Sequence, residues 1–247
     1  MAFDWIQKEW FSKNSKLVFF TGAGMSAESG IRTFRDNDGY WSQYDPMKLA
    51  SPAGFENDPK LVLDWYQYRR NEIKKAKPNK GYDAIENIAK LFPQAQVITQ
   101  NVDGFHKKAD FIDVIELHGN IHKTHCNQCR KENLDGCELL HDDKPIFCDC
   151  GGLMRPSVVW FGESLRLSVM HQAESISRSA DIFFSIGTSS LIYPAAQMPY
   201  EAKNNGAKII EINPQSTPLT SMADASIQGL SGEILFKIYQ ELHANYN

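Results

Sequence analysis

The sequence predicts an α/β fold built on a parallel β-sheet. Short apolar runs recur along the chain, and most are continuous rather than alternating, as in strands that helices cover on both faces. Helical patterns lie between several of these runs, and strands that alternate with helices predict a parallel sheet. The predicted strands are Leu17 to Phe20, Gln96 to Thr99, Val114 to Leu117, Val158 to Phe161, Ile182 to Ile186 and Lys208 to Ile212.

Two helices and two interruptions complete the predicted order of elements. Apolar side chains recur at helical spacing between Tyr82 and Phe92 and again between Ile234 and Leu242. Residues 38–80 contain no convincing strand, and residues 121–155 contain all the cysteines and little periodicity. We therefore predict that both stretches are insertions into the α/β domain.

Length and composition limit the class of protein. A chain of 247 residues suits one main domain with a smaller satellite. A net charge of −4 gives no broad positive field, which makes nonspecific nucleic-acid binding a poor hypothesis. No apolar run approaches the roughly 20 residues that span a bilayer, and the first residues lack a signal-peptide core. We expect a cytoplasmic protein that does not bind membranes.

A glycine-rich turn follows the first predicted strand. In TGAGMSAESG, the residues Gly22, Gly24 and Ala27 match the G-x-G-x-x-G/A pattern, whose small residues let backbone N–H groups approach a pyrophosphate. A dehydrogenase would carry an acidic residue at the end of a second strand about 20 positions later. That distance falls near Asp45, which has no strand around it. The turn indicates a bound dinucleotide, while hydride transfer is disfavoured.

Polar residues follow two further predicted strands. Gln100, Asn101 and Asp103 come after QVIT, and His118 comes after VIEL. Ligands of open α/β sheets bind outside the carboxyl ends of the strands. A lone histidine at a strand end is more often structural, but His118 beside a nucleotide turn is a candidate general base, because the histidine pKa lies near neutrality.

The five cysteines lie between residues 126 and 150. Cys126 and Cys129 form one pair, and Cys148 and Cys150 form a second. Two such pairs can form a tetrahedral Cys₄ zinc site, which stabilises the fold of a small segment. The single residue between Cys148 and Cys150 is less usual than two. A redox pair, reduced structural thiols, or Cys137 in place of one ligand remain alternatives.

The ordered motifs GAGMSAESGIRTFR, TQNVDGFH, ELHGN, VVWFGE, IGTSS and EINP, with the paired cysteines, resemble the sirtuin family of NAD-dependent protein lysine deacylases over residues 16 to 242. The resemblance implies a Rossmann-like NAD-binding domain of residues 1–37, 81–120 and 156–247. It also implies a small domain made of a helical module, residues 38–80, and a zinc-binding module, residues 121–155. NAD and an acyl-lysine protein substrate would meet between the two domains, in a monomer that holds one structural zinc ion.

The resemblance also implies roles for individual residues. The acyl-lysine carbonyl oxygen would attack C1′ of the nicotinamide ribose and release nicotinamide. His118, with Asn101, would then promote attack by a ribose hydroxyl, giving O-acyl-ADP-ribose and free lysine. The residues implied at NAD are Gly22, Ala23, Gly24, Ala27, Phe34, Arg35, Gln100, Asn101, Asp103, Gly187, Thr188, Ser189, Asn213 and Ser231.

Two segments resemble those between which family members hold the substrate peptide as an added strand. The first contains Val159, Trp160, Phe161, Gly162 and Glu163. The second, residues 192–195, contains Tyr193.

Residues 65–70, WYQYRR, resemble the Tyr-x-x-Arg signature of class III of this family. A phenol at Tyr66 and a guanidinium at Arg69 suit a succinyl or malonyl carboxylate, and Ala50 would leave room for a long acyl group. We expect a dual deacetylase and desuccinylase. An amphipathic helix, whose aromatic rings pack inward while its arginine heads stay in solvent, would account for the other residues, Trp65, Tyr68 and Arg70.

Three alternative functions remain open at this point. A noncatalytic ADP-ribose-sensing module would keep the glycine turn and Asn101 but need no base. A mono-ADP-ribosyltransferase could be built on the same scaffold. A Rossmann oxidoreductase with a zinc-stapled insertion lacks the expected acidic residue.

Overall fold

The computed structural model describes residues 7–34, 40–108, 113–133 and 138–246. Its main layer is a six-stranded sheet in the order β11-β10-β9-β1-β2-β3, and every neighbouring pair is parallel. The predicted α/β fold with a parallel sheet is therefore confirmed. The strands are β1 (Leu17–Thr21), β2 (Gln96–Thr99), β3 (Asp113–Glu116), β9 (Ile182–Ile186), β10 (Lys208–Asn213) and β11 (Ala225–Gln228).

Two features of the sheet differ from the sequence prediction. The strand predicted over Val158 to Phe161 is wrong: only Val158 lies in a strand, at the end of β8 (Met154–Val158), which pairs antiparallel with β4 (Gly119–Cys126) outside the main sheet. The run is apolar because Trp160 is buried beside the cavity, not because it forms a central strand. β11 was not predicted: it lies at the sheet edge, and its alternating buried and exposed residues lack a continuous apolar run.

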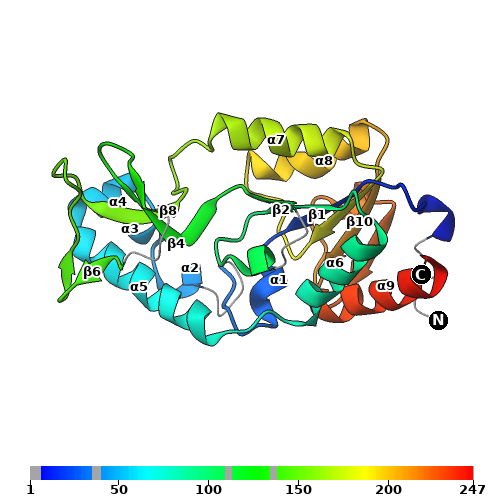
Figure 1. The fold of residues 1–247 in the computed structure, drawn as a ribbon, viewed down its shortest axis with the longest axis horizontal. Helices are drawn as coiled ribbons and strands as arrows, with labels where there is room; N and C mark the ends of the chain where they lie inside the picture. The colour runs from blue at the N-terminus through cyan, green and yellow to red at the C-terminus, as the bar shows by residue number, and fades with distance from the viewer. Residues whose placement is uncertain (1–6, 35–39, 109–112, 134–137, 247) are drawn as a thin grey trace.

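Helices cover both faces of the sheet (Figure 1). On one face α6 (Lys80–Leu91) packs against α9 (Ser231–Tyr246), and on the other α7 (Leu167–Arg178) packs against α8 (Met198–Asn204). Each face has its own core. Phe19 stacks on Phe184 at 5.0 Å in the first, and Phe20 contacts Phe183 at 5.8 Å in the second.

Three helices of the helical insertion begin with the same local sequence, a capping residue followed by proline. Asp45, Ser51 and Asp58 each precede a proline, and each side chain accepts a hydrogen bond from a backbone N–H of the helix that it caps. Proline in the first turn has no N–H to leave unpaired, so these dipeptides specify helix starts. The helices are α2 (Tyr40–Gln43), α3 (Pro46–Leu49), α4 (Pro52–Asn57) and α5 (Pro59–Lys75).

The cysteine-bearing segment lies beside α5, at the left of Figure 1. It contains the sheet β5-β4-β8 and a two-stranded ribbon of β6 and β7. Arg70 of α5 fastens the two together, because its Nε donates to the Ile121 carbonyl at 2.5 Å and its Nη2 to the Lys123 carbonyl at 3.2 Å. The remaining elements are β5 (Glu132–Asn133), β6 (Leu140–His141), β7 (Lys144–Pro145), the four-residue helix α1 (Gly24–Ala27), and the 3₁₀ turns Lys8–Trp10, Phe105–Lys108, Ala195–Gln197 and Thr220–Met222.

The domain boundaries given above stay predictions. Among the described helices, none combines the length and the apolar character that a membrane crossing requires.

Candidate active site

A cavity of about 520 Å³ lies at the carboxyl ends of the central strands, bounded also by α5 and by the segment that follows β8. The structure brings nearly every predicted site residue outside the cysteine cluster to its wall. Arg35 lies outside the described residues. The predicted residues that line the cavity are Gly22, Ala23, Gly24, Ala27, Phe34, Ala50, Tyr66, Arg69, Gln100, Asn101, Asp103, His118, Val159, Trp160, Phe161, Gly162, Glu163, Gly187, Thr188, Ser189, Tyr193, Asn213 and Ser231.

The glycine turn after β1 packs directly on the turn after β9. Gly22 N–H donates to the Ile186 carbonyl at 2.9 Å, and Gly24 N–H donates to the Gly187 carbonyl at 2.8 Å. A Cβ at Gly22 would lie 2.7 Å from the Gly187 oxygen, so a larger residue cannot fit without a backbone shift. This close approach leaves a concave backbone surface at the end of the sheet, which fits the pyrophosphate of NAD.

Asn101 and Asp103 are held by a buried hydrogen-bond network. Asn101 Nδ2 donates to the Gly22 carbonyl at 2.9 Å and to Ser26 Oγ at 3.1 Å. Ser26 Oγ in turn donates to Asp103 Oδ2 at 2.7 Å and lies 2.8 Å from the Tyr82 hydroxyl. Burial raises the pKa of Asp103, and hydrogen bonds from the Phe105 amide and Ser26 oppose that rise. The network fixes one end of the cavity.

Sequence reasoning missed Ser26 and Tyr82 as members of this network. Ser26 lies within the glycine turn and could have been inferred from its position in GMSAESG. Tyr82 belongs to α6, and its apolar neighbours gave no reason to separate it from the core.

His118 follows β3 and lies at the cavity wall. Its Nδ1 lies 3.0 Å from the Gln100 carbonyl oxygen, which can only accept a hydrogen bond. The Nδ1 therefore carries the proton, and the Nε2 keeps its lone pair. Burial lowers the pKa of His118, although the Gln100 carbonyl partly opposes the effect. A neutral imidazole with a free Nε2 is the form that a general base requires.

Gln100 connects His118 to the opposite side of the cavity. Its backbone carbonyl holds His118, and its side-chain Nε2 donates to Thr188 Oγ1 at 2.8 Å. The Thr188 carbonyl accepts from Asn213 Nδ2 at 3.2 Å. Gln100, Thr188 and Asn213, three of the residues that the resemblance implies at NAD, therefore belong to one connected set of hydrogen bonds with His118.

Tyr66 and Arg69 lie on the inner face of α5, where both are buried and line the cavity. The Arg69 guanidinium carbon lies 4.8 Å from the centre of the Phe34 ring and 5.0 Å from that of Trp65. Burial raises the pKa of Tyr66 to about 12, against the opposing effect of Arg69. At neutral pH this end of the cavity therefore presents a neutral phenol and a cation.

The amphipathic-helix interpretation, with aromatic rings packed inward and arginine heads in solvent, holds for Trp65, which is buried. It is wrong for Tyr68, which is exposed, and for Arg70, which is buried. Arg70 is buried because the carbonyl groups of β4 accept its hydrogen bonds, a contact that α5 makes only in the folded chain.

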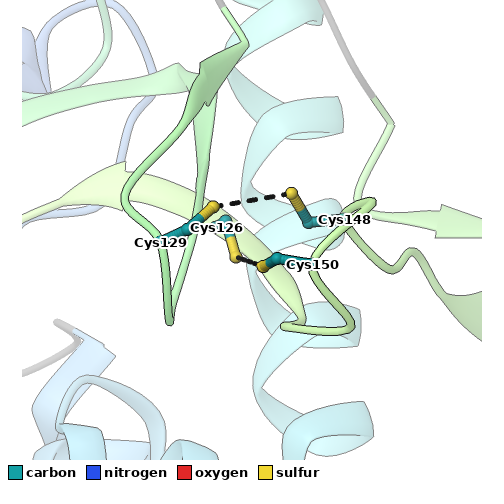
Figure 2. A group of neighbouring side chains, drawn as sticks. All are labelled: Cys126, Cys129, Cys148 and Cys150. Atoms are coloured by element: carbon teal, nitrogen blue, oxygen red, sulfur yellow. Dashed lines mark hydrogen bonds between the residues drawn. The ribbon is translucent and has the colours of Figure 1, made fainter.

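The four predicted zinc ligands converge from two turns, as Figure 2 shows. The sulfur atoms of Cys126 and Cys150 are 3.4 Å apart, those of Cys129 and Cys148 are 3.7 Å apart, and all four lie within 4.8 Å of one another. Four Zn–S bonds of about 2.3 Å in a tetrahedron place sulfurs roughly 3.8 Å apart. The cluster therefore fits a structural zinc ion. Cys137, the alternative ligand, lies outside the described residues.

Comparison with known proteins identifies the family. The model of the Sir2 family matches residues 22–194. An NAD-dependent protein deacylase of Aquifex aeolicus (strain VF5) is 46% identical over 95% of this chain and 98% of its own length. One of Pyrococcus abyssi (strain GE5 / Orsay) is 43% identical over 94% of each chain.

Solved structures agree with the sequence relatives. A Sir2 homologue in complex with NAD superposes with a TM-score of 0.88 at 40% identity, covering 95% of this chain and 92% of that one. A Sir2 variant with a deacetylated p53 peptide and 3′-O-acetyl-ADP-ribose gives a TM-score of 0.79 at 29% identity, covering 91% and 92%. The chain belongs to the Sir2 family of NAD-dependent protein deacylases.

Proposed function

We propose that this deacylase removes acetyl groups and also the negatively charged succinyl and malonyl groups from lysine side chains of proteins. The observation that carries the proposal is the placement of Tyr66 and Arg69. Both are buried, and both line the same cavity as His118. The same cavity therefore offers a base for the chemistry and a cation for the acyl group.

The chemistry of Tyr66 and Arg69 favours a carboxylate over an uncharged acyl end. A guanidinium can donate two parallel hydrogen bonds to one carboxylate, and a neutral phenol can add a third. The phenol keeps its hydrogen because its pKa is raised to about 12. A carboxylate would also supply an opposite charge to a buried cation, which lowers the free-energy cost of burying it.

Ala50 supports the proposal through its size. It is buried at the end of α3 and lines the cavity, and its carbonyl accepts a hydrogen bond from Phe161 N–H at 2.8 Å. This hydrogen bond joins the helical insertion to the segment after β8. A methyl side chain there leaves room for an acyl chain longer than acetyl.

The chain's own residues have separable tasks in the proposed reaction. The Asn101, Ser26 and Asp103 network positions the nicotinamide end of NAD. His118, held through Nδ1, takes a proton from a ribose hydroxyl at Nε2. Cys126, Cys129, Cys148 and Cys150 would hold a zinc ion, which would supply no reaction step and would hold the two cysteine turns together.

The test uses one peptide whose single lysine is acetylated, succinylated or carries the uncharged amide analogue of succinyl. Loss of each acyl group, with and without NAD, is followed by mass spectrometry together with O-acyl-ADP-ribose. Wild-type protein should prefer succinyl to its amide analogue. Arg69→Met should lower kcat/KM for succinyl relative to acetyl by about 10- to 150-fold, the equivalent of a charged hydrogen bond of roughly 1.5–3 kcal/mol.

Two outcomes would contradict the proposal. If Arg69→Met lowers the two activities equally, Arg69 does not recognise the charge of the acyl group. If wild-type protein removes no acyl group but transfers ADP-ribose to the peptide or only binds ADP-ribose, the deacylase function itself is wrong. His118→Tyr is the matched control, because it should abolish turnover while NAD still raises the unfolding temperature.

A further inference from the structure

The indole of Trp160 contacts the predicted acyl-recognition residues from the side opposite α5. Its Nε1 lies 2.8 Å from the Tyr66 hydroxyl oxygen, and the two rings are 6.2 Å apart, with both side chains buried. An indole nitrogen can only donate a hydrogen bond. The direction of this bond is therefore certain: Trp160 donates and the Tyr66 oxygen accepts.

This direction determines where the Tyr66 hydrogen can point. The Tyr66 oxygen receives the Trp160 hydrogen on one lone pair, so its own hydrogen must turn away from the indole. Among the residues that the structure describes, the Tyr66 hydroxyl makes no other hydrogen bond. Tyr66 lines the cavity, so its hydrogen is available to an acceptor on a bound acyl group.

The Trp160 indole packs against the Arg155 guanidinium and the Phe55 ring, and the Trp160 backbone is bound by Glu163. The Arg155 guanidinium carbon lies 3.2 Å from the centre of a Trp160 ring, and the Phe55 ring lies at 5.2 Å. Glu163 accepts hydrogen bonds from Arg155 at 2.7 and 3.0 Å and from the Trp160 backbone N–H at 2.9 Å. Rotation of the indole away from Tyr66 would therefore break its contacts with the Arg155 guanidinium and the Phe55 ring.

We propose that Trp160 is a specificity-determining positioning residue, whose indole N–H orients the Tyr66 hydroxyl so that the phenol donates its hydrogen to the carboxylate of a succinyl- or malonyl-lysine. The inference rests on the proposed function, because it assigns a task at the same acyl site. Trp160 acts through Tyr66 and does not touch the carboxylate. An acetyl group has no carboxylate, so the effect is specific to charged acyl groups.

The first test is Trp160→Phe, which keeps an aromatic ring between Arg155 and Phe55 and removes the N–H donor. The measured quantity is the ratio of kcat/KM for the succinyl-lysine peptide to that for the acetyl-lysine peptide. One neutral hydrogen bond contributes about 0.5–1.5 kcal/mol, so we expect the ratio to fall roughly 2- to 13-fold. The change should appear mainly in KM for the succinyl peptide.

A double-mutant cycle separates positioning from a general structural role. In the Tyr66→Phe background, where no phenol hydrogen remains to be oriented, Trp160→Phe should not change the ratio further. If Trp160→Phe lowers the ratio by the same factor in both backgrounds, Trp160 does not act through Tyr66 and the inference is overturned. An unchanged ratio in the Trp160→Phe single variant overturns it as well.

A failure of the Trp160 inference can be told apart from a failure of the proposed function. If Arg69→Met and Tyr66→Phe leave the ratio unchanged, charged-acyl recognition is wrong, and Trp160 has nothing to orient. If those two variants lower the ratio and Trp160→Phe does not, only the present inference fails. Should Trp160→Phe not fold, Trp160→Met is used in the same cycle, because methionine fills an irregular apolar site and also lacks a donor.

Discussion

The ion pair between Arg155 and Glu163 should contribute measurably to stability, because it is largely removed from water. The Arg155 side chain is 4% exposed and that of Glu163 is 19% exposed. Arg155 donates from both terminal nitrogens to Glu163, and a further hydrogen bond from its Nη2 to the Val158 carbonyl measures 2.9 Å. Glu163→Gln keeps the shape of the side chain and removes its charge, which leaves Arg155 buried without its counter-charge.

The expected size of the effect follows from this burial. Removing one partner of a fully buried pair costs about 3–5 kcal/mol, and the partial exposure of Glu163 lowers this to roughly 2–3 kcal/mol. For a chain of this length, each kcal/mol shifts the unfolding temperature by about 2–4 °C, so Glu163→Gln should unfold about 4–12 °C lower. Urea unfolding at a constant m value gives the free-energy difference directly.

The pH dependence supplies a second measure of the same pair. Burial alone would raise the pKa of Glu163, but the Arg155 hydrogen bonds and the Trp160 amide outweigh it and hold the pKa below 4.5. The stabilisation is therefore fully present above pH 4.5 and is lost as the pH falls through the folded-state pKa. The difference between wild type and Glu163→Gln should shrink in acid.

The control is a cycle with Arg155→Met. Because the two groups interact directly, the double variant should be less destabilised than the sum of the single variants, by about 0.5–3 kcal/mol. Additive effects, or a wild-type advantage that is equal at pH 7 and pH 3, would refute the assignment of this stability to the ion pair.

Three further predictions concern the cavity and the cysteine cluster. Because burial lowers the pKa of His118, the rate of single-turnover deacetylation should fall in acid with a midpoint below pH 6.5; a midpoint above 6.5 would contradict a neutral buried base. In Gly22→Ala, the new Cβ would lie 2.7 Å from the Gly187 oxygen. Overpacking of this kind costs roughly 1–3 kcal/mol, so the KM for NAD in steady-state assays should rise by about 5- to 150-fold. Zinc removal with a chelator, or Cys129→Ser, should lower the unfolding temperature and remove the near-ultraviolet circular dichroism of the small domain, and zinc should restore both only in the wild type.

Much of the fold could be predicted because its signals are local. The continuous runs of β1, β2, β9 and β10 report strands covered on both faces, and they match the observed elements closely. β11 was not predicted because the prediction relied on continuous apolar runs, and this edge strand alternates buried and exposed residues. The Val158 to Phe161 run was misplaced because apolar residues mark burial, and Trp160 is buried beside a cavity instead of within the sheet.

The candidate site divides in the same way. The glycine turn, the polar strand ends and the paired cysteines are short patterns whose spacing has a physical reason, and the sequence alone was enough to select them. The contacts of Tyr82 and Arg70 were missed because their partners lie far away in the chain: Tyr82 meets Ser26 across 56 positions, and Arg70 meets Ile121 across 51.

By itself, the sequence determined which residues could carry the chemistry: a turn that admits a pyrophosphate, a histidine at a strand end, four thiols in two pairs, and a phenol one helical turn from a guanidinium. Only the tertiary structure decided how these groups act on one another. Trp160 and Tyr66 are 94 positions apart, and their hydrogen bond exists because the segment after β8 packs against α5. Local patterns encode backbone conformation and residue type, whereas the direction of a side-chain hydrogen bond depends on packing between distant segments.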